Sequence, residues 1–163
     1  MTPLVGLFDS SLFRFALSGT LITCYLVADV LARRRGIARR APRPPRWVHL
    51  VVLASVTAFY LLIKPAGGAW GGGVLNLAGI ALVLSGCAMR FHQGVRYPEL
   101  TGRGLLYMGL PLAVGVPWGW LVLSAPACVV SVHCALRADE LLAASPGAPL
   151  ERLPSRRMVP GIW

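Results

Sequence analysis

LLYMGLPLAVGVPWGWLVLSAPACVVSVHCAL, residues 105–136, makes up nearly all of the longest uncharged run in the chain. A single membrane span needs about 20 mainly apolar residues, so this run is too long for one helix. The proline and the glycine in Val116-Pro117-Trp118-Gly119 should end a helix near the middle of the run. We therefore predict a tight helical hairpin that dips into a bilayer, with arms at 105–116 and 120–136. The first arm is short for a full crossing.

Three more apolar segments precede the hairpin, at residues 12–32, 47–63 and 74–89. The chain of 163 residues is 56% hydrophobic and only 13% charged, against roughly 25% charged in globular domains. A chain of this length is too short to bury so much apolar surface in a water-soluble core. The sequence thus predicts an all-α integral membrane protein with about five transmembrane helices, the last two forming the hairpin. We expect a single membrane domain, residues 1–163, that ends in a cytoplasmic tail at 137–163.

Positive charge predicts the orientation, because cytoplasmic loops are enriched in lysine and arginine. The loop RRRGIARRAPRPPR, residues 33–46, carries seven arginines. With that loop inside the cell, only Arg14 and Lys64 of the 16 basic residues face outward. We therefore expect a multi-pass protein of a bacterial cell membrane, with its N-terminus outside and its C-terminus in the cytoplasm.

The formal net charge of +10 has the same explanation. Basic cytoplasmic loops attract anionic lipid headgroups, and the prolines at 42, 44 and 45 would break a basic recognition helix. The expected partner is therefore the lipid bilayer, and no nucleic acid is expected. The four cysteines lie in apolar runs without paired spacing, which predicts packing residues. The scattered His49, His92 and His133 predict no metal site.

Polar residues concentrate in two stretches that the hairpin should bring together on the cytoplasmic side. One is RFHQGVRYPELTGR, residues 90–103, and the other is RADE, residues 137–140. Arginines mixed with carboxylates beside a membrane cleft suit a charged, zwitterionic ligand that acts on a lipophilic small molecule in the bilayer. The alternative is structural, with interfacial ion pairs that close the hairpin. The candidate catalytic residues are Arg90, Glu99, Arg137 and Asp139.

Three short motifs follow one another in residues 90–163. RYPELTG at 96–102 precedes the hairpin, RADELL at 137–142 follows it, and RRMVP at 156–160 closes a basic stretch. In this order they resemble the isoprenylcysteine carboxyl methyltransferase and phospholipid methyltransferase group of membrane enzymes. That group has an Arg-His-Pro motif, a Glu-Glu-x-x-Leu motif and a terminal Val-Pro at the corresponding places.

The resemblance implies a five-helix membrane fold that binds S-adenosylmethionine at the cytoplasmic end of the hairpin. It also implies methyl transfer to a lipophilic substrate, such as a prenyl or lipid-like molecule, that enters from the bilayer. Arg96 and Pro98 would shape the cofactor loop, and Glu140 would accept hydrogen bonds from the cofactor's amino group. Arg90 or Arg137 would orient a substrate carboxylate. The implied cofactor-binding residues are His92, Arg96, Tyr97, Pro98 and Glu140.

Several positions depart from the family pattern. Tyr97 stands at the motif histidine, Glu99 replaces an aromatic side chain, and Asp139 replaces the first acid of the second motif. Two other functions therefore stay open. One is an isoprenoid or lipid isomerase or cyclase that works without S-adenosylmethionine and uses Glu99, Asp139 or Glu140 as a proton donor. The other is a membrane partner protein without catalysis.

Overall fold

The computed structural model of the chain describes residues 11–36, 46–63, 72–92, 97–116 and 118–143, and these residues contain helices and no strand. The predicted all-helical class is thus confirmed for the described residues. The last helix continues directly from a short π-helical stretch. The helices are α2 (Ser11–Arg34), α3 (Arg46–Ile63), α4 (Gly72–Met89), α5 (Pro98–Val114), η1 (Trp120–Ser124) and α6 (Ala125–Ala143).

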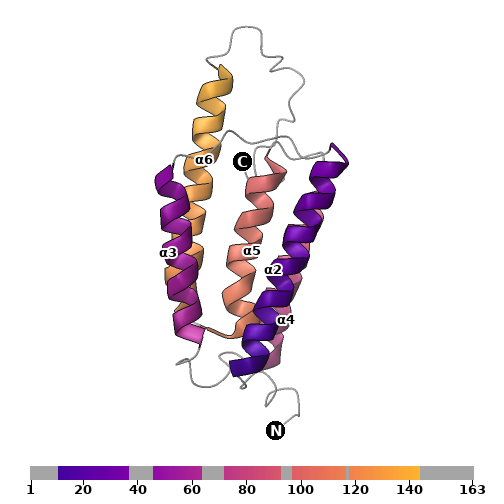
Figure 1. Cartoon of the computed structure of the whole chain (residues 1–163), viewed down its shortest axis with the longest axis vertical. Helices are drawn as coiled ribbons and strands as arrows, with labels where there is room; N and C mark the ends of the chain where they lie inside the picture. The colour runs from indigo at the N-terminus through magenta and orange to yellow at the C-terminus, as the bar shows by residue number, and fades with distance from the viewer. Residues whose placement is uncertain (1–10, 37–45, 64–71, 93–96, 117, 144–163) are drawn as a thin grey trace.

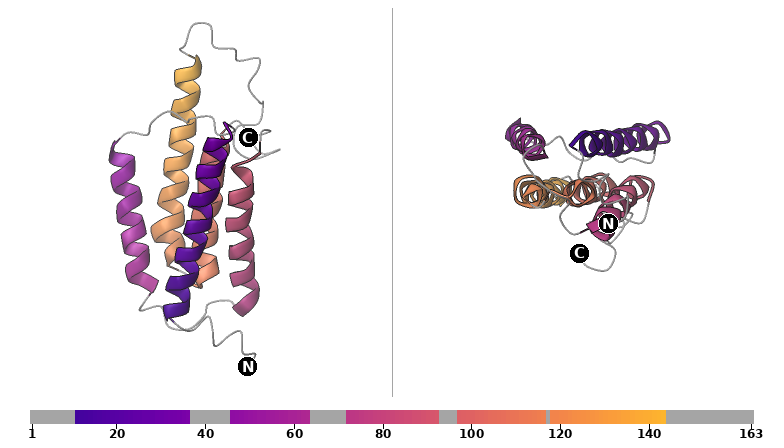
Figure 2. Two further views of the ribbon diagram at one scale, coloured as in Figure 1. Left: turned by 45° about the vertical axis from the view of Figure 1, so that its right-hand side comes forward. Right: turned by 90° about the horizontal axis from the view of Figure 1, so that it is seen from below.

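The helices lie side by side in a bundle, and consecutive helices point in opposite directions (Figure 1). Seen along the bundle, α2 and α3 lie on one side of a row made by α4, α5 and α6 (Figure 2). α5 is in the middle of this row, packed against α4 on one side and against α6 and η1 on the other. The C-terminal ends of α2 and α4 and the N-terminal end of α5 therefore lie at the same end of the bundle.

A helix lies at each apolar segment that the sequence identifies, and the largest differences are at the start of α5 and at the end of α6, which runs to Ala143 into the predicted tail. The sequence analysis places the first arm of the hairpin at 105–116, whereas α5 begins at Pro98. Pro98 occupies the first turn, where a helix loses nothing by lacking an N–H, and Glu99 follows at the positive end of the helix dipole. These start signals lie in a polar stretch, so a count of apolar residues places the start of the helix too late.

Among the helices that the structure describes, two are long and apolar enough to cross a membrane. One is Ser11–Arg34, with mean hydropathy 1.7, and the other is Trp120–Ala138, with mean hydropathy 1.6. The apolar parts of α3 and α4 are shorter. By length and composition, these two helices are candidate membrane spans.

Glycines face one another where α4 packs against α5. Gly79 and Gly86 of α4 meet Gly109 and Gly102 of α5, respectively. The spacing of seven residues on each helix is about two turns, so both contacts fall on one face of each helix. A Cβ atom at Gly79 would lie 2.2 Å from the Ala113 nitrogen, and one at Gly109 would lie 2.6 Å from the Gly79 oxygen. Small residues of this kind allow helix backbones to approach closely in membrane proteins.

The turn of the hairpin lies between α5 and η1, where the sequence predicts a break. Gly115 follows α5 in the left-handed conformation, with φ 71° and ψ 35°, and its N–H donates to the Leu112 carbonyl. Glycine adopts this conformation without the steric cost that a Cβ atom brings. On the far side of the turn Gly119 contacts Phe59, since a Cβ atom at Gly119 would lie 2.7 Å from the Phe59 ring. The turn therefore also docks α3.

Two prolines inside the hairpin are accommodated locally. Pro111 has no N–H to donate to the Tyr107 carbonyl four residues earlier, and the Ser124 hydroxyl donates to that carbonyl instead, at 2.7 Å. Pro126 follows the π-helical stretch, in which the N–H of Ala125 donates to the Trp120 carbonyl five residues earlier. A wider turn of this kind relieves the clash between a proline ring and the preceding turn.

Candidate functional site

Five charged side chains gather where three helix ends meet. Asp29 and Arg33 lie in the last two turns of α2, Arg90 follows the last residue of α4, and Glu99 and Arg103 lie in the first two turns of α5. An acidic side chain in the first turn of a helix and basic side chains in the last turn interact favourably with the helix dipole. We call these five residues the charge chain.

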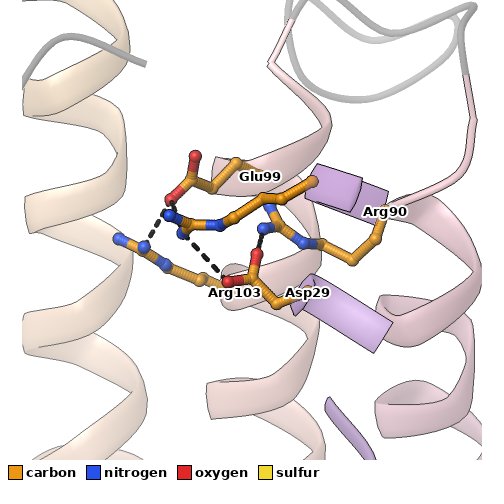
Figure 3. A network of polar contacts seen from close by, with 5 residues as sticks. Asp29, Arg90, Glu99 and Arg103 are labelled. Atoms are coloured by element: carbon orange, nitrogen blue, oxygen red, sulfur yellow. Dashed lines mark hydrogen bonds and ion pairs between the residues drawn. The ribbon is translucent and has the colours of Figure 1, made fainter. Parts of the chain in front are cut away.

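In the charge chain each carboxylate lies between two arginines (Figure 3). Asp29 pairs through one oxygen with Arg33, at 2.9 Å, and through the other oxygen with Arg90. Glu99 uses a single oxygen, Oε1, for Arg103 and, at 3.6 Å, for Arg33. Three positive charges therefore alternate with two negative ones, in the order Arg90, Asp29, Arg33, Glu99 and Arg103.

The two ends of the charge chain differ in burial. Arg90 is 1% exposed, and its guanidinium carbon lies 5.8 Å from the centre of the Tyr25 ring, a distance typical of cation–π contacts. The Arg103 side chain is 37% exposed. A buried arginine depends on its carboxylate partner, whereas a partly exposed one can exchange partners.

A cavity of about 310 Å³ lies beside Arg103, between α2, α3 and α5, and we call it the cleft. Most of its lining is apolar or aromatic, and Asp29 and Arg103 are its charged lining residues. Both belong to the end of the bundle that holds the charge chain, so the cleft has one charged end and one apolar end. The lining residues are Ile22, Tyr25, Leu26, Asp29, Val56, Phe59, Tyr60, Arg103, Leu106, Tyr107, Leu110 and Leu123.

The four candidate catalytic residues divide between the charge chain and α6. Arg90 and Glu99 belong to the charge chain, as described above. Arg137 lies on α6 and pairs with Glu140 at 3.3 Å, with side chains 66% and 65% exposed. Asp139 also lies on α6, and its side chain is outside the part that the structure describes. The structure thus brings two of the four together.

The two polar stretches, residues 90–103 and 137–140, are predicted to lie close together, and apolar side chains make the contact between them. Tyr97 and Leu100 at the start of α5 are buried in a cluster with Ala135 and Ala138 of α6. This contact places the beginning of α5 next to the Arg137–Glu140 pair along α6. The first two of the three motifs that carry the resemblance are therefore neighbours in space.

The residues implied to bind S-adenosylmethionine differ in burial. His92 and Glu140 are exposed, whereas Tyr97 and Pro98 are buried at the start of α5. None of these four lines the cleft. Arg96 lies outside the described residues. The binding of S-adenosylmethionine by this set therefore stays a prediction.

The sequence analysis missed the contribution of α2 to the site. Asp29 and Arg33 hold the middle of the charge chain, and neither was among the candidate residues. A signal was present, because a carboxylate inside an apolar span normally faces protein and finds a cation. The arginine four residues later also gives the spacing of an ion pair on one helix face. What the pattern could not supply was the identity of Arg90 as the second partner.

Chemically, the charge chain and the cleft suit an anionic group. Positive charges outnumber negative ones by one, and Arg33 and Arg103 share a single oxygen of Glu99. Of these two arginines only Arg103 lines the cleft. A guanidinium binds a carboxylate or phosphate through two parallel hydrogen bonds. An anion at the charged end of the cleft would therefore meet Arg103.

Comparison with known proteins identifies no relative from which the function of this site could be inferred. No family model matches the chain, and neither does any curated protein or solved structure.

Proposed function

We propose that the chain is a multi-pass membrane protein that binds a single-chain amphiphile, lipid-like or prenyl-like with an anionic head group, in the cleft. The observation that carries this proposal is the cleft itself, which is apolar over most of its lining and charged at one end. The head group would pair with Arg103, and the chain would lie between α2, α3 and α5. Such a ligand matches the lipophilic substrate that the sequence predicts.

The surface of the bundle supports a membrane setting for this ligand. Large apolar side chains on α2, α3, α4 and α6 point outward, among them Leu12, Leu61, Val74 and Val129, which are 70% to 80% exposed. Large apolar side chains exposed in such number are favourable in lipid. A helix of 18 residues, such as α3 or α4, is about 27 Å long, close to the hydrocarbon thickness of about 30 Å. Local thinning of the bilayer accommodates the difference.

The charges of the bundle ends support the proposed orientation. The charge chain and the basic residues at the end of α2 lie at one end of the bundle. We propose that this end faces the cytoplasm, since basic loops are retained there. The charged end of the cleft then lies at the headgroup level, and its apolar end lies within the hydrocarbon.

The size of the cleft supports one apolar chain. Pockets for small molecules range from roughly 300 to 1,000 Å³, and the cleft, at about 310 Å³, is near the lower limit. A diacyl lipid would need a second channel for its second chain. We therefore propose a single alkyl or prenyl chain as the apolar part of the ligand.

Removing the charge of Arg103 should weaken binding of an anionic amphiphile. We expect Arg103→Gln to lower the affinity for dodecanoate by about 10- to 100-fold, the effect of losing a hydrogen bond to a charged group. Tritiated dodecanoate binding to the protein in nanodiscs of zwitterionic lipid measures this affinity. Dodecanol has the same chain and no charge, so it should bind the unchanged protein more weakly than dodecanoate does. Its affinity should be the same for Arg103→Gln as for the unchanged protein.

Arg34→Gln is the matched control, because Arg34 is an exposed arginine at the end of α2 and does not line the cleft. It removes the same charge from the same end of the bundle and should leave dodecanoate affinity within about twofold. Equal losses in Arg34→Gln and Arg103→Gln would show only a long-range effect of charge. Equal binding of dodecanol and dodecanoate to the unchanged protein would contradict an anionic head group, and stronger binding of a two-chain phosphatidate would contradict a single chain.

Methyl transfer to this amphiphile is a second proposal, favoured by one observation. The first and second motifs of the resemblance are neighbours, through the buried cluster of Tyr97 and Leu100 with Ala135 and Ala138. Exposed Glu140 lies one turn or less beyond this cluster along α6. The proposal thus places S-adenosylmethionine at the end of α6, outside the cleft. When bound, it would supply an electrophilic methyl group.

Under this second proposal, S-adenosylmethionine should bind saturably to the purified protein, and Glu140→Gln should weaken binding at least tenfold. Calorimetric titration of the folded protein, with and without dodecanoate, measures this. Absence of saturable binding would reject methyl transfer and leave amphiphile binding untouched. Isoprenoid isomerisation or a role without catalysis would then be the next candidates for the same cleft.

A further inference from the structure

The arginine that a ligand in the cleft would meet already has a carboxylate partner. The two ends of the charge chain are different: Arg90 is buried beneath the helices, and Arg103 borders the cleft. Every anion that reaches Arg103 from the cleft meets an arginine that is already paired with Glu99. The anion of the ligand and the Glu99 carboxylate therefore compete for one guanidinium.

Glu99 cannot simply be left without a cation. Its side chain is only 12% exposed, and a carboxylate that is largely removed from water loses much stability when it has no partner. Arg33 is the cation at hand, since its Nη2 atom is 3.6 Å from the same Glu99 oxygen. The Arg33 side chain is 54% exposed, so it has room to move toward Glu99.

The position of Arg33 is held from the other side as well. Asp29 forms an ion pair with Arg33 at 2.9 Å. Asp29 also pairs with the buried Arg90, which holds its side chain in place. Arg33 thus stays close to Glu99 whether or not Arg103 is engaged. Neither Arg33 nor Glu99 lines the cleft, so both act on the ligand through Arg103.

We infer that Glu99 is the internal competitor of the ligand for Arg103, and that Arg33 is the positioning residue that receives the Glu99 carboxylate when the ligand binds. This inference rests on the proposed binding of an anionic amphiphile. Glu99 sets the threshold that an anion must exceed, and so selects ligands whose head group binds a guanidinium better than a side-chain carboxylate does. Arg33 lowers that threshold by offering Glu99 a second partner.

A double-mutant cycle with Arg33→Gln and Glu99→Gln tests the exchange, with tritiated dodecanoate and zwitterionic nanodiscs as before. Glu99→Gln should bind dodecanoate about 2- to 10-fold more tightly than the unchanged protein, because the competing pair is gone. Arg33→Gln should bind it more weakly by a similar factor. In the double variant the Arg33 substitution should have no further effect, so its affinity should equal that of Glu99→Gln.

Arg33→Lys provides a conservative rescue, because a lysine keeps a cation near Glu99 and should keep affinity within about twofold. A merely structural role of Arg33 would give the same loss with and without Glu99, and that result would overturn the inference. Unchanged or weaker binding to Glu99→Gln, in a protein whose thermal unfolding is intact, would do so too. Failure of the proposed function looks different, because dodecanoate would then not bind the unchanged protein or would not depend on Arg103.

Discussion

Replacing Gly109 with alanine is expected to lower the free energy of unfolding by about 3 kcal/mol. The added Cβ atom would lie 2.6 Å from the Gly79 carbonyl oxygen and 2.9 Å from side-chain atoms of Leu82 and Val83. Because the closest atom belongs to the backbone of α4, no change of rotamer can relieve the contact. α4 and α5 would have to move apart along the face where they pack. Unfolding of the detergent-solubilised protein, followed by circular dichroism, measures the loss.

Gly104→Ala is the matched control on the same helix. A Cβ atom at Gly104 meets nothing within 4 Å, so alanine there brings only its higher helix propensity. We expect this variant to be as stable as the unchanged protein or more stable, by up to about 1 kcal/mol. Equal losses at both positions would mean that α4 and α5 do not approach at Gly109, and would contradict the packing described here.

The contrast between these two glycines shows what the sequence could and could not predict about the fold. Apolar length and the proline and glycine of the turn were enough to place the helical segments and the reversal of the hairpin. They were not enough to show which face of α4 packs, because the apolar residues of α4 are spread around the helix and form no single stripe. The seven-residue spacing of Gly79 and Gly86 acquires meaning only next to the same spacing on α5.

The site was predictable where its residues are close in the sequence. Arg90 and Glu99 flank one short connection between helices, so their proximity follows from the chain itself. Arg137 and Glu140 are three residues apart on one exposed helix face and pair with each other. This pair within α6 competes with the predicted contacts between residues 137–140 and residues 90–103. Asp29 comes from a distant helix, and only the packing of α2 on α4 and α5 brings it to Arg90.

Breaking the buried ion pair of the charge chain should cost more than any other change in the site. Asp29→Asn is expected to lower the free energy of unfolding by about 3 to 5 kcal/mol, because it leaves the charge of Arg90 without its carboxylate. Arg90 is 1% exposed, so water cannot replace the lost partner. Its contact with the Tyr25 ring offsets only a small part of the loss. The same unfolding experiment in detergent measures the effect.

Removing both charges separates the cost of an unpaired arginine from the value of the ion pair. Asp29→Leu with Arg90→Met replaces the pair by apolar side chains and should recover most of the lost stability. Glu140→Gln breaks an exposed pair on α6 and should change stability by no more than about 1 kcal/mol. If Asp29→Asn were as mild as Glu140→Gln, Arg90 would have to be hydrated, and the charge chain would lose its fixed end. Because Asp29 also holds Arg33 beside Glu99, we expect Asp29→Asn to lower the free energy of unfolding and to weaken dodecanoate binding together.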